Sequence, residues 1–135
     1  MESLYNILQT LKSDLETDLP ALLVAAGLVD FNRYVLGPSK NPEETALCLY
    51  HDEGQFDDEN NDLNLFIQLQ LYEKDYEDSL KYIDVVKEYM KVYDPANLGF
   101  TILKKLIDDS FPLDENQTTF VFFEVKYNEQ LDSCD

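Results

Sequence analysis

Basic residues are scarce in this sequence of 135 residues: 10 lysines and arginines stand against 28 aspartates and glutamates, which gives a formal net charge of −18. Nucleic-acid phosphates would be repelled by such a surface, so the composition argues against a protein that wraps nucleic acid. The same repulsion argues against an anionic membrane surface. The charge is compatible with a basic protein partner, or with a surface that must not stick to DNA, and it favours solubility.

Long apolar runs are also missing. No segment approaches the roughly 20 apolar residues that are needed to span a bilayer. The first residues, Met-Glu-Ser-Leu-Tyr, contain neither a basic region nor the start of an apolar core, so we see no signal peptide. We therefore expect a cytoplasmic protein.

Cysteine is rare, and its two positions differ in setting. Cys48 lies inside an apolar run, whereas Cys134 is next to the last residue. Two such positions do not make a disulfide framework. We expect a buried, inert thiol at Cys48 and an exposed thiol in a frayed tail at Cys134.

Residues that carry chemistry are few or scattered. His51 is the only histidine, and the sequence offers it no nucleophile or acid as a catalytic partner. One histidine and two distant cysteines do not form a zinc site, and the four glycines form no phosphate-binding loop. Acidic pairs occur throughout, so none of them singles out a catalytic site; examples are Glu43-Glu44, Asp57-Asp58 and Asp108-Asp109. We predict a non-enzymatic protein with no catalytic, cofactor-binding or metal-binding residues and no cofactor.

The acidic segment 52–62 raises the hypothesis of a calcium site, because hard cations bind several oxygen atoms from one loop. An EF-hand loop needs glycine at its sixth position and glutamate at its twelfth. In the register that starts at Asp57, these positions hold Asp62 and Gln68, and the register that starts at Asp58 fails in the same way. We interpret the segment as an exposed, solvated loop, and weak cation binding there stays open.

The strongest pattern is the alternation over Leu63–Tyr72, in which every odd position from 63 to 71 is leucine or isoleucine. A period of two predicts a half-buried β-strand. From Asp75 to Lys91 the period changes to that of an amphipathic helix. Its predicted buried stripe consists of Tyr76, Leu80, Ile83, Val86 and Met90. A strand followed by a helix that lies back on its apolar face is the nucleus of a two-layer α+β domain.

Tyrosine is abundant on this second helix. We expect Tyr82, Tyr89 and Tyr93 to flank its buried stripe. Tyrosine is enriched at protein interfaces, because it buries area and keeps a polar group. Tyrosines around an ordinary core would give the same pattern, so both interpretations stay open.

The remaining elements follow from shorter patterns. Leucine and isoleucine at helical spacing predict an N-terminal helix from Glu2 to about Thr17. Pro20 then begins a second helical piece over 21–26, or one longer helix is kinked at Pro20. The other predictions are a short strand over 30–36, an interior strand over 45–51, an extended segment within 96–112, a strand over 118–127 and a frayed tail over 128–135. For the segment 96–112, helix is the alternative.

These elements predict a single α+β domain over residues 1–135. Its sheet is antiparallel or mixed, has four to five strands, and packs on the N-terminal helix and the second amphipathic helix.

Three features of this order point to a family. They are an apolar strand followed by a polar loop with Glu53-Gly54, the alternating strand that leads directly into a helix, and the final strand Phe-Val-Phe-Phe-Glu-Val-Lys-Tyr. From Glu2 to Tyr127, in element order, length and hydrophobic pattern, the sequence resembles the tail terminator (tail completion) proteins of long-tailed bacteriophages and prophages, including the lambda-type minor tail protein U group. The family has no signature residues, so the resemblance transfers no site residue.

The resemblance implies a structural protein with a β-sheet packed on helices. It implies assembly into a ring, usually a hexamer, that caps the tail tube and presents a surface to the head connector, and hence a virion component without direct nucleic-acid binding. Acidic walls would prevent DNA from sticking inside such a ring. The alternative is an acidic inhibitor, an immunity protein or a DNA mimic that binds a basic protein partner.

Overall fold

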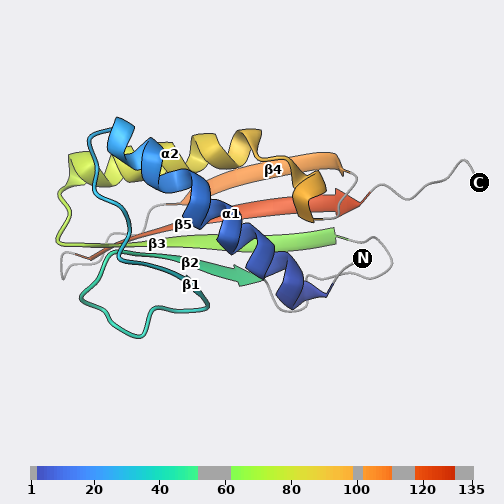
Figure 1. The fold of residues 1–135 in the computed structure, drawn as a ribbon, viewed down its shortest axis with the longest axis horizontal. Coiled ribbons are helices and arrows are strands. Elements are labelled where there is room, and N and C mark those ends of the chain that lie inside the picture. Colours follow the sequence, from blue (N-terminus) through green and yellow to red (C-terminus); the bar gives the residue numbers. More distant parts are fainter. Residues whose placement is uncertain (1–2, 52–61, 99–101, 111–117, 130–135) are drawn as a thin grey trace, which may run out of the picture.

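The structure is a computed structural model that describes residues 3–51, 62–98, 102–110 and 118–129. These residues form an α+β fold in which two helices cover one face of a mixed sheet (Figure 1). The elements in chain order are α1 (Leu4–Ala25), β1 (Arg33–Leu36), β2 (Ala46–His51), β3 (Asp62–Tyr72), α2 (Tyr76–Val92), the 3-10 helix η1 (Pro95–Leu98), β4 (Ile102–Ser110) and β5 (Thr118–Glu129). The predicted α+β class is confirmed.

The strand order in the sheet is β1-β2-β3-β5-β4, so the described strands β1 and β4 form its two edges. β1 runs parallel to β2, and the other neighbours are antiparallel. The predicted alternating strand is β3, which lies in the middle of the sheet. It pairs with β5 over its whole length, from Asp62 opposite Asn128 to Tyr72 opposite Thr118.

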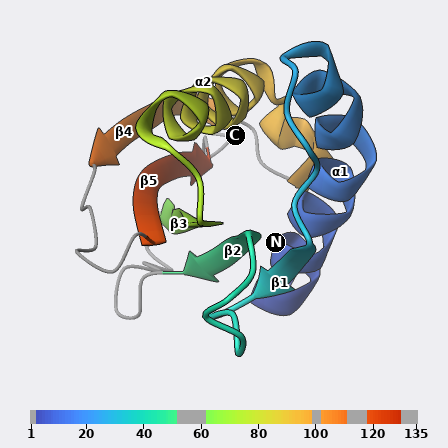
Figure 2. The same ribbon diagram turned by 90° about the vertical axis from the view of Figure 1, so that its left-hand side faces the viewer.

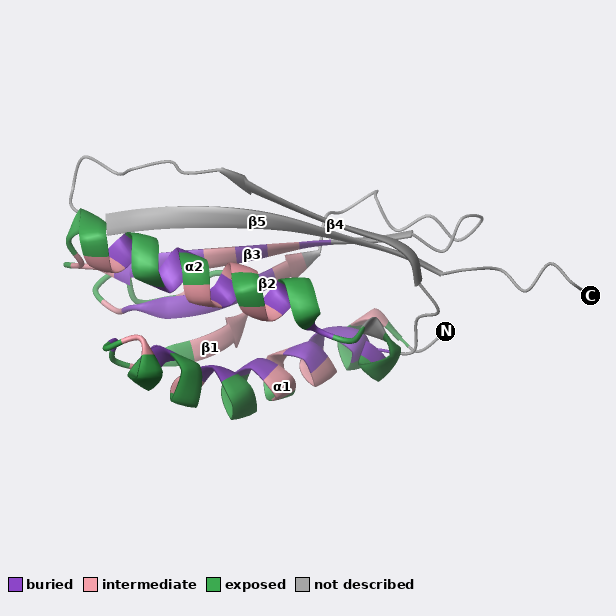
Figure 3. Ribbon diagram, turned by 90° about the horizontal axis from the view of Figure 1, so that it is seen from above, coloured by how far each residue is buried: buried purple, intermediate pink, exposed green. Residues whose placement is uncertain are grey.

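The core lies between the helices and the sheet. Leu65, Ile67, Leu69 and Leu71 of β3 are fully buried, as the alternation predicted. They form one cluster with the buried stripes of both helices, which Figure 3 shows as lines of purple along the ribbons. Each such side chain contributes roughly 1.5–3 kcal/mol when it is buried.

Of the two alternatives for the N-terminal region, the structure has the single longer helix through Pro20, α1. The prediction that it ends near Thr17 and that a second piece follows is wrong, because one helix continues through Pro20 to Ala25. Leu19 and Leu23, which stand on either side of the proline, are both fully buried, and their burial offsets the hydrogen bond that proline cannot make. The chain leaves the helix at Gly27, whose φ of 78° is a conformation that glycine adopts without strain.

Helix α2 turns a different side to the core from the one predicted. Tyr76 is 66% exposed, and Leu80 is exposed as well, whereas Ser79 and Tyr82 are buried. The prediction that Tyr76 and Leu80 belong to the buried stripe is therefore wrong. The buried stripe instead consists of Ser79, Tyr82, Ile83, Val86 and Met90, and the Tyr82 hydroxyl within it donates to the carbonyl oxygen of Val29 (2.5 Å).

The C-terminal strands extend the sheet beyond β3. The extended segment predicted within 96–112 is confirmed for Ile102–Ser110. β5 continues to Glu129, which lies opposite Ile102, so the prediction that the tail begins at residue 128 is wrong at its first two positions. The acidic loop predicted over 52–62 lies outside the described residues except for Asp62, and so does Cys134.

Candidate interaction surface

Tyrosine hydroxyls hold α2 against α1. The hydroxyl of Tyr89 donates to Asp18 Oδ2 (2.7 Å), and that of Tyr93 donates to Asp14 Oδ2 (2.5 Å). Tyr93 and Tyr82 are buried, so the prediction that these two tyrosines flank the core is wrong. Their hydroxyls serve the packing of the helix layer. The order of the contacts also shows that the two helices run in opposite directions, which Figure 1 illustrates, and Figure 2 shows both on the same side of the curved sheet.

A groove lies between the outer sides of the two helices. Its volume is about 460 Å³, and most of its lining surface is apolar. The lining residues are Leu22 of α1 and Asp84, Val85, Glu88, Tyr89 and Val92 of α2. Val92 is 79% exposed and Leu22 is 44% exposed. Apolar side chains that line a hollow in the surface are typical of a contact site for another molecule.

The charged groups of the groove lining are both acidic. They are the carboxylates of Asp84 and Glu88. Glu88 Oε1 lies 3.2 Å from Lys91 Nζ, and both side chains are largely exposed. Such an exposed pair contributes about 1 kcal/mol at most, so a partner's cation can replace the lysine at little cost. The groove thus combines an apolar floor with an acidic rim.

The end of helix α1 adds to this negative potential. Leu22 stands in the last turn of α1, and that turn contains no basic residue. The aligned peptide dipoles give the C-terminal end of a helix a partial negative charge. Here the carbonyl oxygens of Leu22, Leu23 and Val24 accept hydrogen bonds from the N–H groups of residues 26–28, so the effect is that of the helix dipole alone. This end of the groove therefore favours a positive group in a ligand.

A second hollow, of about 430 Å³, lies beside β1 and is lined by residues 16 and 30–35. Asp30 Oδ1 accepts hydrogen bonds from the Tyr34 hydroxyl and from the backbone N–H of Phe31, both at 2.7 Å. Burial of the Tyr34 ring, and then the Asp30 carboxylate, raise the pKa of Tyr34 well above its usual range. Asn32 Oδ1 accepts from the Thr45 N–H (3.0 Å), and Arg33 lies 3.7 Å from Glu44, so the polar groups of this hollow hold β1 to neighbouring segments, and we assign no chemistry to it.

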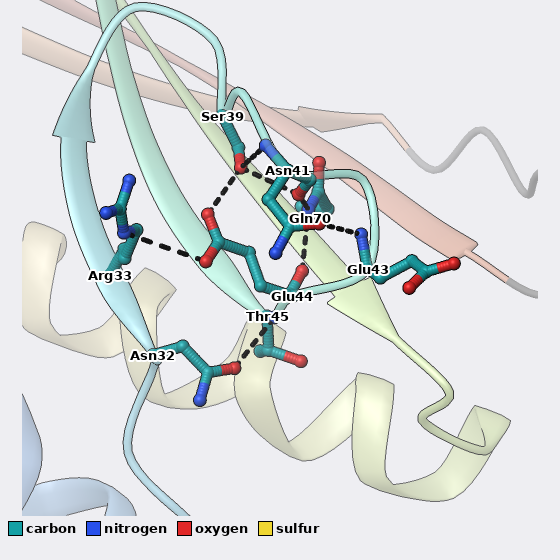
Figure 4. A network of polar contacts seen from close by, with 8 residues as sticks. All are labelled: Asn32, Arg33, Ser39, Asn41, Glu43, Glu44, Thr45 and Gln70. Carbon is teal, nitrogen blue, oxygen red and sulfur yellow. Dashed lines mark hydrogen bonds and ion pairs between the residues drawn. The ribbon is translucent and has the colours of Figure 1, made fainter.

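On the face of the sheet away from the helices, residues 38–44 form a strap (Figure 4). Gln70 of β3 is 5% exposed, and its Nε2 donates to the carbonyl oxygens of Asn41 (2.9 Å) and Glu44 (2.6 Å). Within the strap, the Ser39 hydroxyl donates to Glu44 Oε1 (2.7 Å). A buried amide on the central strand therefore holds the strap against the sheet.

Cys48 lies on the same face as Gln70, and its side chain is 1% exposed. The predicted burial of this thiol is confirmed. Burial also raises the pKa of Cys48, and a thiol with a raised pKa reacts slowly, because the thiolate is the nucleophile.

The other residues that the sequence analysis tested for chemistry lie apart. His51 ends β2 opposite Leu65, the pair Glu43-Glu44 belongs to the strap, and Asp108-Asp109 lies in β4. Within the described ranges, no group of three His, Cys, Asp or Glu side chains is arranged to hold a metal ion. In the same part of the chain, neither helix has the length and apolar character to cross a membrane.

The groove was not predicted from the sequence. Leu22, Val85 and Val92 are apolar residues outside the buried stripes of their helices, and this is the only sign of the groove in the sequence. Comparison of the sequence with protein-family models and with curated proteins gave no match.

Proposed function

We propose that this protein is a non-enzymatic structural protein of the phage or prophage tail-terminator or head–tail joining type, which assembles into a ring. The observation that carries the proposal is the element order: a helix, three strands, a helix and two strands, with one mixed sheet beneath the helix layer. This order agrees with the architecture that the family resemblance implies. A hexameric ring, contacts with tail-tube and head-connector proteins, and a place in the virion belong to the same proposal.

The two edges of the sheet support self-association. An edge strand presents backbone N–H and C=O groups that can pair with another chain. The described edges are different strands, β1 and β4. Any contact that joins β1 of one copy to β4 of the next is head-to-tail, and contacts of this kind close into a ring when the rotation between copies fits.

The net charge sets the conditions for assembly. Copies that each carry −18 repel one another, and salt screens this repulsion beyond ~8 Å at physiological ionic strength. We expect rings at high protein concentration and moderate salt, and smaller species at low salt. In the assembled ring, the same charge keeps passing DNA from adhering to the wall.

Negative-stain electron microscopy of the concentrated protein in moderate salt tests the proposal. The expected result is closed rings with a central channel, which join end-on to tail tubes when tail-tube protein from the same genome is added. A protein that stays monomeric under these conditions, with and without tube protein, contradicts the proposal.

An acidic inhibitor or DNA mimic is the second candidate, and the acidic rim of the groove favours it. It predicts a monomer that binds a basic DNA-binding protein in one-to-one complexes and competes with DNA for that protein. Pull-down with basic DNA-binding proteins, followed by a DNA competition assay, separates it from the ring proposal.

A further inference from the structure

We propose that the groove between α1 and α2 is the docking site for a basic amphipathic helix supplied by a partner protein. This inference concerns the surface of a single subunit. It stands whether or not the subunits form a ring.

The shape of the groove fits a helix. Val85, Tyr89 and Val92 follow one another at intervals of four and three residues along α2, and Leu22 of the antiparallel α1 completes the lining. These side chains form an apolar strip between two ridges of helix. Grooves of this kind bind helices that present apolar residues at positions i, i+3, i+4 and i+7.

The acidic groups around the groove favour a basic partner. Asp84 and Glu88 border the strip, Glu88 is paired with the exposed Lys91, and the end of the strip beside Leu22 lies at the C-terminal end of α1. A helix with lysine or arginine beside its apolar stripe therefore gains attraction along the groove, whereas an acidic helix is repelled.

A second copy of this chain fits the groove less well. It carries the same charge of −18, and both helices that the structure describes already bury their apolar stripes in the core. The partner chemistry is therefore a basic helix from a different protein.

The first test uses fluorescence anisotropy on dilute protein with three labelled synthetic peptides. One has a leucine stripe at helical spacing and lysine elsewhere, the second has glutamate in place of lysine, and the third is a scramble of the lysine peptide. We expect the lysine peptide to bind with a Kd on the order of micromolar and the other two to bind at least about tenfold more weakly. Equal binding of the scramble, or equal binding of the glutamate peptide, overturns the proposal.

Variants of the protein locate the site. Val92→Gln and Leu22→Gln change exposed side chains in the groove, and each should weaken binding of the lysine peptide by about tenfold. Val24→Gln is the matched control, because Val24 is 68% exposed on the same helix and does not line the groove. It should bind like the unchanged protein. Unchanged binding by Val92→Gln and Leu22→Gln, with urea unfolding curves like that of the parent, overturns the assignment.

The acidic rim is tested separately. Asp84→Asn with Glu88→Gln should weaken the lysine peptide by about fivefold at low salt and flatten the salt dependence of binding. A salt dependence as steep as that of the unchanged protein contradicts the role of these two carboxylates.

If Val92→Gln instead abolishes self-association and leaves peptide binding intact, a second copy covers the groove, and the proposal of a basic partner fails.

Discussion

At the scale of single residues, tyrosine hydroxyls bind three of the carboxylates that lie beside the helix layer. Asp14, Asp18 and Asp30 each accept a hydrogen bond from a tyrosine, namely Tyr93, Tyr89 and Tyr34 in that order. With 10 basic residues for 28 acids, most carboxylates lack a cationic partner. A phenol donates a hydrogen bond without adding a charge, and it brings a large apolar ring to the core.

Removing one of these hydroxyls should cost stability. Tyr93→Phe takes the donor from Asp14 and leaves the ring in place, so we expect the free energy of unfolding to fall by about 1–2 kcal/mol. Urea denaturation measures this change. Tyr76→Phe is the control, because Tyr76 is largely exposed, and its effect should be near zero. Equal effects of the two substitutions would contradict the structural role of the Tyr93 hydroxyl.

The buried Tyr82 and the partly buried Tyr34 also predict that stability falls at alkaline pH. Burial raises the pKa of Tyr34 and of Tyr82 above the ordinary value of 10.0. In the unfolded chain these phenols lose their protons near pH 10, whereas in the folded chain they keep them. Stability is therefore full below pH 10 and falls as the pH rises above it. Urea unfolding at a series of pH values between about 8 and 11 measures the loss. Tyr34→Phe should make the loss smaller, and a loss that stays unchanged in this variant would exclude Tyr34 as a cause.

At the scale of elements, local patterns predicted most of the helices and strands. The alternation in β3 was sufficient to predict both the strand and its buried face, because every odd position between 65 and 71 is buried in the core. The rotation of α2 was not predictable, because it depends on contacts with residues far away in sequence, such as that of Tyr82 with Val29. The parallel pairing of β1 with β2 was not predictable for the same reason. The groove was missed because the presence of a leucine or valine in the sequence does not tell whether its side chain is buried in the core or lines a hollow in the surface.

Continuation of α1 through Pro20 gives a direct test at this scale. Pro20→Ala restores a backbone donor inside a helix, so we expect the free energy of unfolding to rise by about 1–3 kcal/mol. Ala21→Gly, at the exposed neighbouring position, should lower it by roughly 0.5–1 kcal/mol. Thermal and urea unfolding measure both changes. If Pro20→Ala destabilises the protein, Pro20 does not stand in a helix interior.

We expect the strap to limit the access of reagents to the Cys48 thiol. Gln70→Ala removes both bonds to the strap, so we expect about 1–3 kcal/mol of destabilisation and a faster reaction of Cys48 with a thiol reagent. The labelling rate is measured in a Cys134→Ser background. Tyr93→Phe is the control, because it also destabilises the protein but acts on the helix side of the sheet, through Asp14, and not on the strap. Equal labelling of the two variants would show that Gln70 does not hold the strap over the thiol.

At the scale of the whole molecule, charge and fold must be considered together. The fold offers two different sheet edges and an apolar groove for contacts with other chains, while the charge of −18 opposes contact between like copies. The ring proposal therefore requires that self-association depends on ionic strength. An inhibitor that acts as a monomer requires no such dependence, so this is where the two proposed functions differ most.

The most direct measurement of the central claim is solution mass against protein concentration, by light scattering after size exclusion, at low and at high salt. The account predicts one discrete oligomer that becomes dominant as concentration and salt increase, because screening removes the repulsion between subunits. A monomer at every concentration and every salt would contradict the ring and leave the acidic inhibitor as the better account.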